Sequence, residues 1–252
     1  MPKATPSVMV VIPARYGSSR FPGKPLVMLG RKPMIQHVYE QAEACCAVTE
    51  VLVATDDERI KQAVEGFGGR AVMVAGDYRT GTDRVAGVAR MFGGDYFVNL
   101  QGDEIPLQPD LLADLIDPFI KSGTGMGTLK RTIDSTEDIH NPSVVKVVTD
   151  HFGNAIYFSR APIPVVRDDA SRRAVEGLHY IHLGLYIYRR DTPPDGWRMR
   201  KSSSSCARWS MASQSESGKP HRPPCGWIRR KMSSRWQNSS NSVTSSSGSW
   251  AR

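Results

Sequence analysis

The sequence predicts an α/β fold with a mostly parallel sheet, helices on both faces of it, and a smaller antiparallel extension. Up to residue 120, short apolar runs with β-branched or aromatic residues alternate with segments of helical spacing. This order builds a parallel sheet with crossover helices. After Gly123 the apolar residues recur with a period of two or in short runs, which is typical of antiparallel strands.

Four buried strands are expected in the parallel part: residues 7–13, 50–55, 70–74 and 95–100. Each segment is a short, largely apolar run, which is typical of a strand buried on both faces of a sheet. Helices are expected at residues 33–44, 56–67, 82–92 and 110–120. In the second helix Asp56 can cap the first turn, and Gly66, Gly68 and Gly69 can end the last one.

The antiparallel extension is expected to hold strands at residues 126–132, 144–149, 155–159 and 180–189. Gly153 and Asn154 separate two of them and fit a tight hairpin turn. In sheets of this class, ligands bind beyond the carboxyl ends of the parallel strands. The first loops to inspect are therefore residues 14–25 and 101–106.

The 252-residue chain has a net charge of +8, yet residues 1–190 hold 22 basic and 22 acidic side chains, so the excess lies in residues 191–252. No run of about 18 apolar residues occurs, so no membrane span is expected. The five-residue apolar run near the N-terminus is too short for a signal peptide. Four cysteines, with Cys45 and Cys46 adjacent, do not form a disulfide framework, so we expect a reducing, cytoplasmic protein with these two thiols in the core or on a helix face.

Residues 191–252 differ from the rest of the chain in composition. They contain 17 serines and all five tryptophans, but no leucine, phenylalanine or tyrosine. So few aliphatic side chains cannot bury enough surface to offset chain entropy, so this tail is expected to be disordered. A nucleic-acid-binding function would rest on this basic tail alone.

The loop at residues 14–25 is a candidate phosphate site. Gly17 and Gly23 allow a close backbone approach, and Arg15, Arg20 and Lys24 supply three positive charges. The spacing does not match a P-loop, because five residues separate the glycines and proline follows the lysine. The alternative interpretation is a solvated basic turn.

The loop at residues 101–106 is a candidate metal site. Asp103 follows a strand and a glycine, at the edge where a bound triphosphate would need Mg²⁺. The alternative is that Asp103 and Glu104 cap a helix or lie on the surface. One carboxylate holds Mg²⁺ weakly, so a second acid is expected from elsewhere in the chain.

Six segments together resemble a known family: VIPARYGSSRFPGKPL (11–26), TGTDR (80–84), NLQGDE (99–104), NPSVVKVV (141–148), YFSRAPIP (157–164) and HLGLYIYR (182–189). In this combination and order they resemble the 3-deoxy-manno-octulosonate cytidylyltransferases, or CMP-Kdo synthetases. The resemblance implies a Rossmann-like nucleotidyltransferase domain over residues 1–190. It also implies a cytoplasmic transferase of lipopolysaccharide biosynthesis that joins CTP and 3-deoxy-D-manno-octulosonate (Kdo) to give CMP-Kdo and pyrophosphate. Mg²⁺ as cofactor and a homodimer as assembly follow from the same resemblance.

The resemblance also assigns roles to individual residues. Arg15, Lys24 and Asp103 would be the catalytic groups, with Arg15, Arg20 and Lys24 on the CTP phosphates and Asp103 on Mg²⁺. The cytosine would lie by Thr80, Gly81 and Thr82, and Gln101 would contact the nucleotide or the sugar. The sugar would be held by Arg160 at its carboxylate and by His182 and Tyr186 at its hydroxyls.

Alternatives remain open for these assignments. The TGTDR segment also fits a helix start capped by Thr80 or Thr82, and His182 alone would be interpreted as a hydrogen-bonded strand histidine. At the level of function, the alternatives are a related cytidylyltransferase for another acid sugar and nucleic-acid binding through the tail.

Beyond residue 191 the resemblance ends, although the family continues with an LEQLR segment and a closing VDTPED segment. If the third base of each codon is read with the first two of the next, residues 201–216 can be read as KLEQLRALEHGIPIR and residues 227–234 as VDTPEDVE. A shift of reading frame near residues 192–197 explains the missing leucines, the serine runs and the tryptophans together. The shift would remove a Glu-Gln pair of the sugar site and the second metal carboxylate, so we expect impaired activity.

Overall fold

The structure is a computed structural model that describes residues 5–17, 21–76, 78, 80–103, 109–133, 135–165 and 178–192, and the backbone of 209–213. By its contacts the chain divides into Met1–Ser217 and Gly218–Arg252. The second unit lies outside the described residues, so all elements given below belong to the first. Arg20 and most of the tail also lie outside them.

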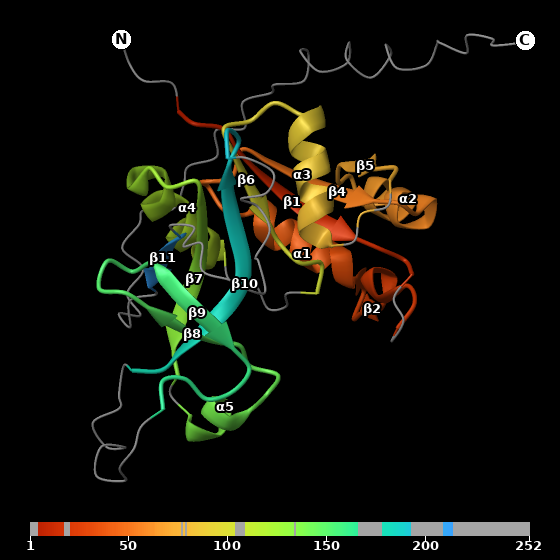
Figure 1. Cartoon of the computed structure of the whole chain (residues 1–252). Helices are drawn as coiled ribbons and strands as arrows, with labels where there is room; N and C mark the ends of the chain where they lie inside the picture. The colour runs from red at the N-terminus through yellow and green to blue at the C-terminus, as the bar shows by residue number, and fades with distance from the viewer. Residues whose placement is uncertain are drawn as a thin grey trace, which may run out of the picture. The chain divides into compact units, whose positions relative to one another are not determined.

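A nine-stranded sheet organises the first unit, with strand order β11-β7-β10-β6-β1-β4-β5 and with β8 and β9 beside this path (Figure 1). The parallel part consists of β6 (Tyr96–Asn99), β1 (Val8–Ala14), β4 (Glu50–Thr55) and β5 (Ala71–Met73). Strand β10 (Tyr180–Arg189) runs antiparallel between β6 and β7 (Met126–Thr132). It also pairs with β8 (Lys146–Thr149), which forms a hairpin with β9 (Ala155–Ser159). The predicted fold class is confirmed.

Helices cover both faces of the sheet, and β1 divides the core between them. Val8, Val10 and Ile12 pack in one cluster with α1 (Met34–Glu43), α2 (Glu58–Gly66) and α4 (Pro109–Ser122). Met9 and Val11 point to the opposite face and pack with α3 (Gly81–Met91). This alternation is the period-two geometry of a strand buried on both faces.

The expected strands and helices of residues 1–190 are confirmed, with ends within two residues of the prediction. Short elements that the sequence did not predict are the 3₁₀ turn η1 (Lys24–Leu26), the two-residue strands β2 (Met28–Leu29) and β3 (Lys32–Pro33), and α5 (Thr136–His140). The hairpin turn before β9 is confirmed, since Gly153 has a φ of +81° and Asp150 accepts hydrogen bonds from the amides of Phe152 and Asn154. Cys45 is buried and Cys46 is exposed, just after α1, and both are free thiols.

One helix start was predicted wrongly. Asp57, and not Asp56, caps α2, because the Asp57 carboxylate accepts a hydrogen bond from the Arg59 amide at 3.0 Å. Asp56 instead forms an ion pair at 2.5 Å with Arg84 of α3, whose side chain is fully buried. A tertiary contact therefore decides which of two adjacent aspartates is free to cap the helix.

In the tail, the structure describes one element, β11 (Trp209–Ser213), which pairs in parallel with β7. Asp191 and Thr192 are also described, and the rest of the segment expected to be disordered lies outside the described residues. Disorder of that remainder stays a prediction.

Packing of α4 on β7 depends on the absence of a side chain at Gly127. A Cβ at this position would lie 2.6 Å from Phe119 Cδ2 and 3.1 Å from Ile187 Cγ2. We expect Gly127→Ala to lower the free energy of unfolding by about 1–3 kcal/mol, as overpacking of a core does. Urea denaturation measures this change.

Gly184→Ala is the matched control, because Gly184 lies on the neighbouring strand β10 and an added Cβ there would meet no atom within 4 Å. Equal destabilisation by the two substitutions would contradict the packing argument.

Candidate active site

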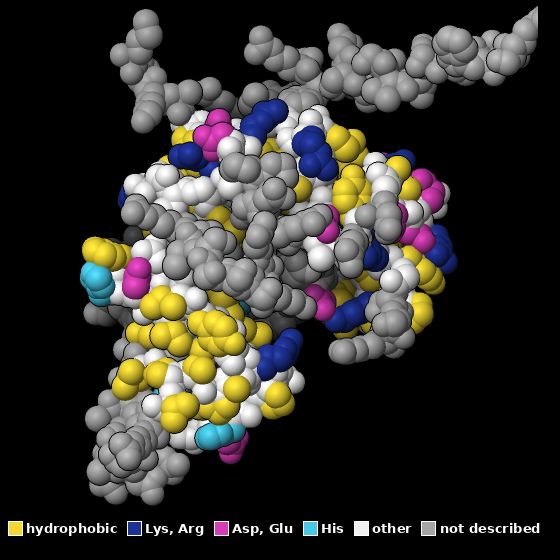
Figure 2. Space-filling view, in the orientation of Figure 1, with side chains coloured by type: hydrophobic (Ala, Val, Ile, Leu, Met, Phe, Trp, Pro, Cys, Tyr) yellow, Lys and Arg dark blue, Asp and Glu magenta, His cyan; other side chains and the backbone are white. Residues whose placement is uncertain are grey.

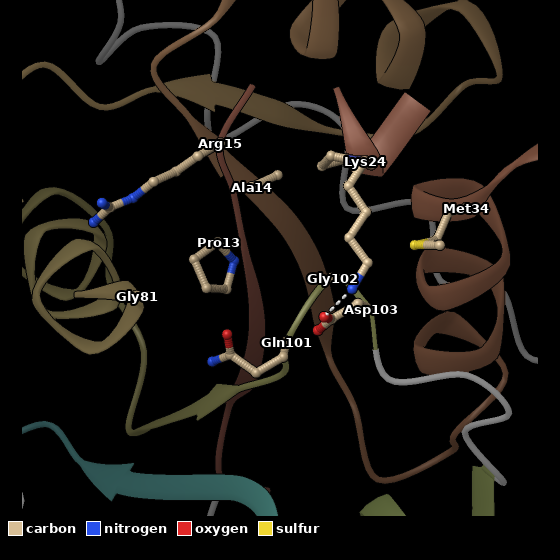
Figure 3. Close-up of a pocket in the computed structure, with 10 residues that line it drawn as sticks. Pro13, Ala14, Arg15, Lys24, Met34, Gly81, Gln101, Gly102 and Asp103 are labelled. Carbon is tan, nitrogen blue, oxygen red and sulfur yellow. Dashed lines mark hydrogen bonds and ion pairs between the residues drawn. The ribbon is translucent and has the colours of Figure 1, made fainter. Parts of the chain in front are cut away.

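A cavity of about 270 Å³ lies beyond the carboxyl ends of β1 and β6 (Figure 3). These strands are parallel neighbours, with Val11 opposite Asn99, so the loops that follow them leave the sheet at the same edge. The cavity is lined by residues of both loops and by the first residues of α1 and α3: Pro13, Ala14, Arg15, Lys24, Pro25, Met34, Gly81, Gln101, Gly102 and Asp103. This is the edge at which the sequence predicted a ligand site.

The first loop is held closed by its own contacts. The Gly23 amide donates to the Tyr16 carbonyl at 2.8 Å, and Gly23 takes a φ of +70° directly under the Tyr16 ring. The guanidinium of Arg59 lies 3.3 Å from the centroid of that ring. These contacts fix the described ends of the loop, and the 3₁₀ turn that follows places Lys24 at the cavity.

Lys24 and Asp103 meet across the cavity, one from each loop (Figure 3). The Lys24 ammonium lies 2.5 Å from a carboxylate oxygen of Asp103, and both side chains are about half exposed. Within the described residues no group of three or more histidine, cysteine or acidic side chains is placed to hold a metal ion. Asp103 is a single accessible carboxylate, which fits a Mg²⁺ ion that keeps most of its waters.

Arg15 does not point toward Lys24. Its side chain extends from β1 toward α3, away from the Lys24–Asp103 pair (Figure 3), and its guanidinium donates to the carbonyl oxygen of Tyr78. In this structure Arg15 therefore connects the first loop to the segment that leads into α3. Its assignment to the phosphates stays a prediction.

The start of α3 forms the third wall of the site. Thr80 caps the helix, with its hydroxyl accepting from the Asp83 amide at 3.2 Å and the Asp83 carboxylate accepting from the Thr80 amide at 3.1 Å. A Cβ on Gly81 would lie 3.1 Å from Pro13 and 3.5 Å from the Gln101 amide group. The capping interpretation is confirmed for Thr80, and the helix N-terminus with its partial positive charge faces the cavity.

Asn99 links this helix to Gln101. The Asn99 amide donates to the Thr82 hydroxyl at 3.2 Å, and the Gln101 amide donates to the Asn99 side-chain oxygen at 2.9 Å. Asn99 is fully buried and was not among the predicted site residues. Its place in the NLQGDE segment, within a strand predicted to be buried, was the available signal. An asparagine buried there needs polar partners.

Of the residues predicted to bind the sugar, Gln101 lines the cavity, whereas Arg160, His182 and Tyr186 lie on the antiparallel extension, outside the cavity lining. Tyr186 is opposite Asn99 across β10 and β6, and its ring centroid lies 5.3 Å from that of His182. Arg160 is exposed just after β9, where its guanidinium donates to the Pro142 carbonyl at 2.7 Å. Asn99, which is hydrogen-bonded to the cavity residue Gln101, therefore lies beside Tyr186, and Tyr186 lies beside His182.

Thr128, which the sequence did not single out, sets the protonation of His182. The register of β10 against β7 shifts between Leu183 and Tyr186, and the Thr128 hydroxyl donates into this bulge, to the Leu185 carbonyl, at 2.6 Å. Because its only proton is used, the Thr128 oxygen accepts a hydrogen bond from His182 Nε2, 3.0 Å away. Nε2 therefore carries the imidazole proton. The free Nδ1 of His182 is a hydrogen-bond acceptor.

Burial keeps this pair of side chains uncharged. It lowers the pKa of His182 from 6.5 to about 4 and raises the pKa of the Tyr186 phenol. At neutral pH, His182 is therefore a neutral imidazole and Tyr186 keeps its proton. Neutral donors and acceptors of this kind suit sugar hydroxyls.

The fold and the cavity define the class of the protein: a Rossmann-like α/β protein with a cavity at the carboxyl edge of its parallel strands. A family model described as cytidylyltransferase matches residues 9–202, and the chain belongs to the cytidylyltransferase family.

The relatives point to one branch of that family. The chain is 49% identical over 192 residues to the 3-deoxy-manno-octulosonate cytidylyltransferase of Geobacter sulfurreducens, covering 73% of this chain and 77% of that protein. It is 50% identical over 191 residues to the protein of the same name from Geobacter metallireducens, covering 73% and 75%. Among solved structures it resembles a CMP:2-keto-3-deoxy-manno-octonic acid synthetase complexed with CTP, with a TM-score of 0.71, 37% identity and coverage of 82% of this chain and 90% of that one.

The buried, neutral His182 makes stability depend on pH. Between pH 7 and 4 the unfolded chain binds a proton at this histidine while the folded chain does not, so stability falls as the pH falls through this window. We expect this one group to account for a loss of up to about 3 kcal/mol. Urea denaturation at pH 7, 5.5 and 4.5 measures it.

His182→Gln should flatten this pH dependence, whereas His151→Gln, at an exposed histidine, should leave it as in the parent chain. Parallel pH profiles for the parent chain and His182→Gln would show that the histidine does not titrate as the burial requires.

Proposed function

We propose that this chain is a cytidylyltransferase that binds CTP in the cavity between loops 14–25 and 101–106. It joins CTP to Kdo, giving CMP-Kdo and pyrophosphate for lipopolysaccharide biosynthesis. The observation that carries the proposal is the convergence of Lys24, Gly81, Gln101 and Asp103 on one cavity. Identity of about half to relatives with this name and likeness to a CTP complex support it.

The reaction needs positioning and charge neutralisation rather than a covalent nucleophile. The anomeric hydroxyl of the sugar attacks the α-phosphorus of CTP in line, and pyrophosphate leaves. Lys24 and the backbone of loop 14–25 hold the phosphates, together with Arg20 and with Arg15 after its side chain turns from Tyr78. The start of α3 at Thr80, Gly81 and Thr82 faces the cytosine.

The proposed cofactor is Mg²⁺, which would be held by Asp103 and would offset negative charge on the phosphates. Asp103 is accessible and its carboxylate is a ligand that Mg²⁺ prefers, but Lys24 occupies it in this structure. Mg²⁺ at Asp103 would compete with Lys24 for the carboxylate and would thereby favour contact of Lys24 with phosphate.

The sugar is proposed to lie between Gln101 and the antiparallel extension. Arg160 would pair with the sugar carboxylate, for which a planar guanidinium is suited. His182 and Tyr186 would contact hydroxyls as neutral groups. Arg160 is exposed in this structure, so its contact with the sugar would be formed at the mouth of the site rather than in the core.

We propose that the tail beyond residues 192–197 comes from a shifted reading frame. The matches to the Geobacter relatives cover similar shares of both proteins, so about a quarter of each remains without a counterpart in the other. A shift of reading frame in the tail would leave such an unmatched share in each of two related chains. The lost segment would hold the second metal carboxylate.

The proposed assembly is a homodimer in the cytoplasm. Hydrophobic side chains gather over β8 and β9 (Figure 2). Ile156 and Tyr157 of β9 are about 60% exposed, and in the described sheet this strand pairs with β8. A second copy of the chain could cover this surface. In the described part of the chain, no helix is long and apolar enough to cross a membrane.

Pyrophosphate release from CTP with Kdo and Mg²⁺ tests the proposed function. We expect the chain as written to be about 10²–10³-fold slower than a frame-restored chain, which is the usual effect of removing one main electrostatic element of a site. Chelation of Mg²⁺ should abolish the restored activity. Sialic acid in place of Kdo is the control for a related acid-sugar transferase, and equal turnover of the two sugars, or full activity of the chain as written, would contradict the proposal.

Arg160→Ala tests the sugar site in the frame-restored chain. We expect the KM for Kdo to rise about tenfold while the KM for CTP changes by less than about twofold, because a hydrogen bond to a charged group contributes about 1.5–3 kcal/mol. Arg90→Ala, at an exposed arginine of α3, is the control. A similar rise in both KM values would rule out the assigned role.

A further inference from the structure

Lys146 of β8 is fully buried, and each proton of its ammonium group has a partner. It donates to the carbonyl oxygens of Asn141 at 2.9 Å, Val144 at 2.8 Å and Arg160 at 2.7 Å. An ammonium group has three N–H donors. All of them are used on backbone oxygens, so Lys146 has no proton left for a ligand.

These three oxygens come from two segments of the chain. Asn141 and Val144 belong to the loop that follows α5, and Arg160 follows β9. The guanidinium of Arg160 donates to Pro142 of the same loop at 2.7 Å. Arg160 is therefore held to this loop twice, by its carbonyl through Lys146 and by its side chain directly.

We propose that Lys146 is a positioning residue for the sugar site, which fixes loop 141–144 and Arg160 relative to each other so that the guanidinium is presented to the carboxylate of an acid sugar. This inference rests on the proposed function of Arg160. Lys146 does not touch the substrate.

A hydrophobic side chain could fill the same space, but it could not replace these contacts. It would remove the ammonium donor from three carbonyl oxygens of two segments, leaving Asn141 with the Val144 amide and the Val144 and Arg160 carbonyls without this bond. Conversely, a buried ammonium is tolerated only when fully hydrogen-bonded. The lysine is therefore best explained by the junction that it forms.

The charges at this junction fit an anionic ligand. Burial and then the neighbouring Arg160 lower the pKa of Lys146, and Asp138 acts in the opposite direction. Two positive charges thus lie close together at the end of β9. A carboxylate bound to Arg160 would offset this repulsion, so the junction favours an acid sugar over a neutral one.

The test compares Lys146→Met with Lys130→Met in the full chain. Lys130 of β7 is a matched control, since it is 8% exposed but its ammonium donates to Thr149 and lies over the Tyr180 ring, apart from loop 141–144. The first readout needs no substrate: the rate at which phenylglyoxal modifies Arg160, followed by mass spectrometry. We expect Lys146→Met to raise this rate at least about threefold over the rate in Lys130→Met.

The second readout is equilibrium binding of Kdo and of CTP to the same variants of the frame-restored chain. Lys146→Met should weaken Kdo binding about tenfold and leave CTP binding within about twofold. If Lys146→Met does not fold, Lys146→Arg replaces it. A planar guanidinium does not match three carbonyls that converge on a tetrahedral ammonium, so this variant should also free Arg160.

The two hypotheses fail in different ways. If Arg160 reacts no faster in the Lys146 variants than in Lys130→Met, the positioning role is wrong whatever the sugar does. It is also wrong if Arg160 is released while Kdo binding stays at the parent level. If Arg160 is released but the frame-restored chain binds neither CTP nor Kdo, Lys146 positions Arg160 and the proposed function is wrong.

Discussion

The parallel pairing of β1 with β6 is the constraint on which the site depends. Because Val11 lies opposite Asn99, the last residues of β1, Pro13 and Ala14, lie beside the point where the chain leaves β6 for Gln101. Segments almost 90 residues apart in sequence thus form one edge. Lys24 meets Asp103 across this edge, and Gly81 brings the start of α3 against Pro13 and Gln101, where a larger residue would push the helix away.

Strand β10 connects this edge to the antiparallel extension. One end of it pairs with β6 and places Tyr186 beside Asn99, and the other end pairs with β8 and carries His182. The bulge between Leu183 and Tyr186 interrupts the pairing of β10 with β7, and the Thr128 hydroxyl donates a hydrogen bond to the Leu185 carbonyl there. The same hydroxyl fixes the imidazole proton, so a local irregularity of the sheet determines what His182 can offer a ligand.

Most of the fold followed from local pattern, because short apolar runs and glycine stops specify strands and helix ends on their own. The two loops of the site were also predictable, since charged and glycine-rich residues directly follow buried strands. What could not be predicted depends on partners distant in sequence. Asp56 and Asp57 have the same helix-capping propensity, and the ion pair of Asp56 with Arg84 is what distinguishes them. Thr128 gains its role from residues more than 50 positions away, Lys146 from Arg160, and Arg15 turns to Tyr78. Strand β11 lies in a serine-rich tail, and its parallel pairing with β7, far away in the sequence, identifies it as a strand.

Electrostatics at this site are set over a few ångströms and not by the charge of the chain. The net charge of +8 lies in the tail, and residues 1–190 are neutral overall, so bulk charge gives no information about an anionic substrate. At the cavity, Lys24 and Asp103 neutralise each other, and as a half-exposed pair they contribute no more than about 1 kcal/mol to stability. Separating them is therefore inexpensive for the fold. A ligand that brings both phosphate for Lys24 and a cation for Asp103 replaces each partner at once, whereas phosphate alone would leave the Asp103 carboxylate facing like charge. The pair thus favours a nucleotide accompanied by its counter-cation over the nucleotide alone.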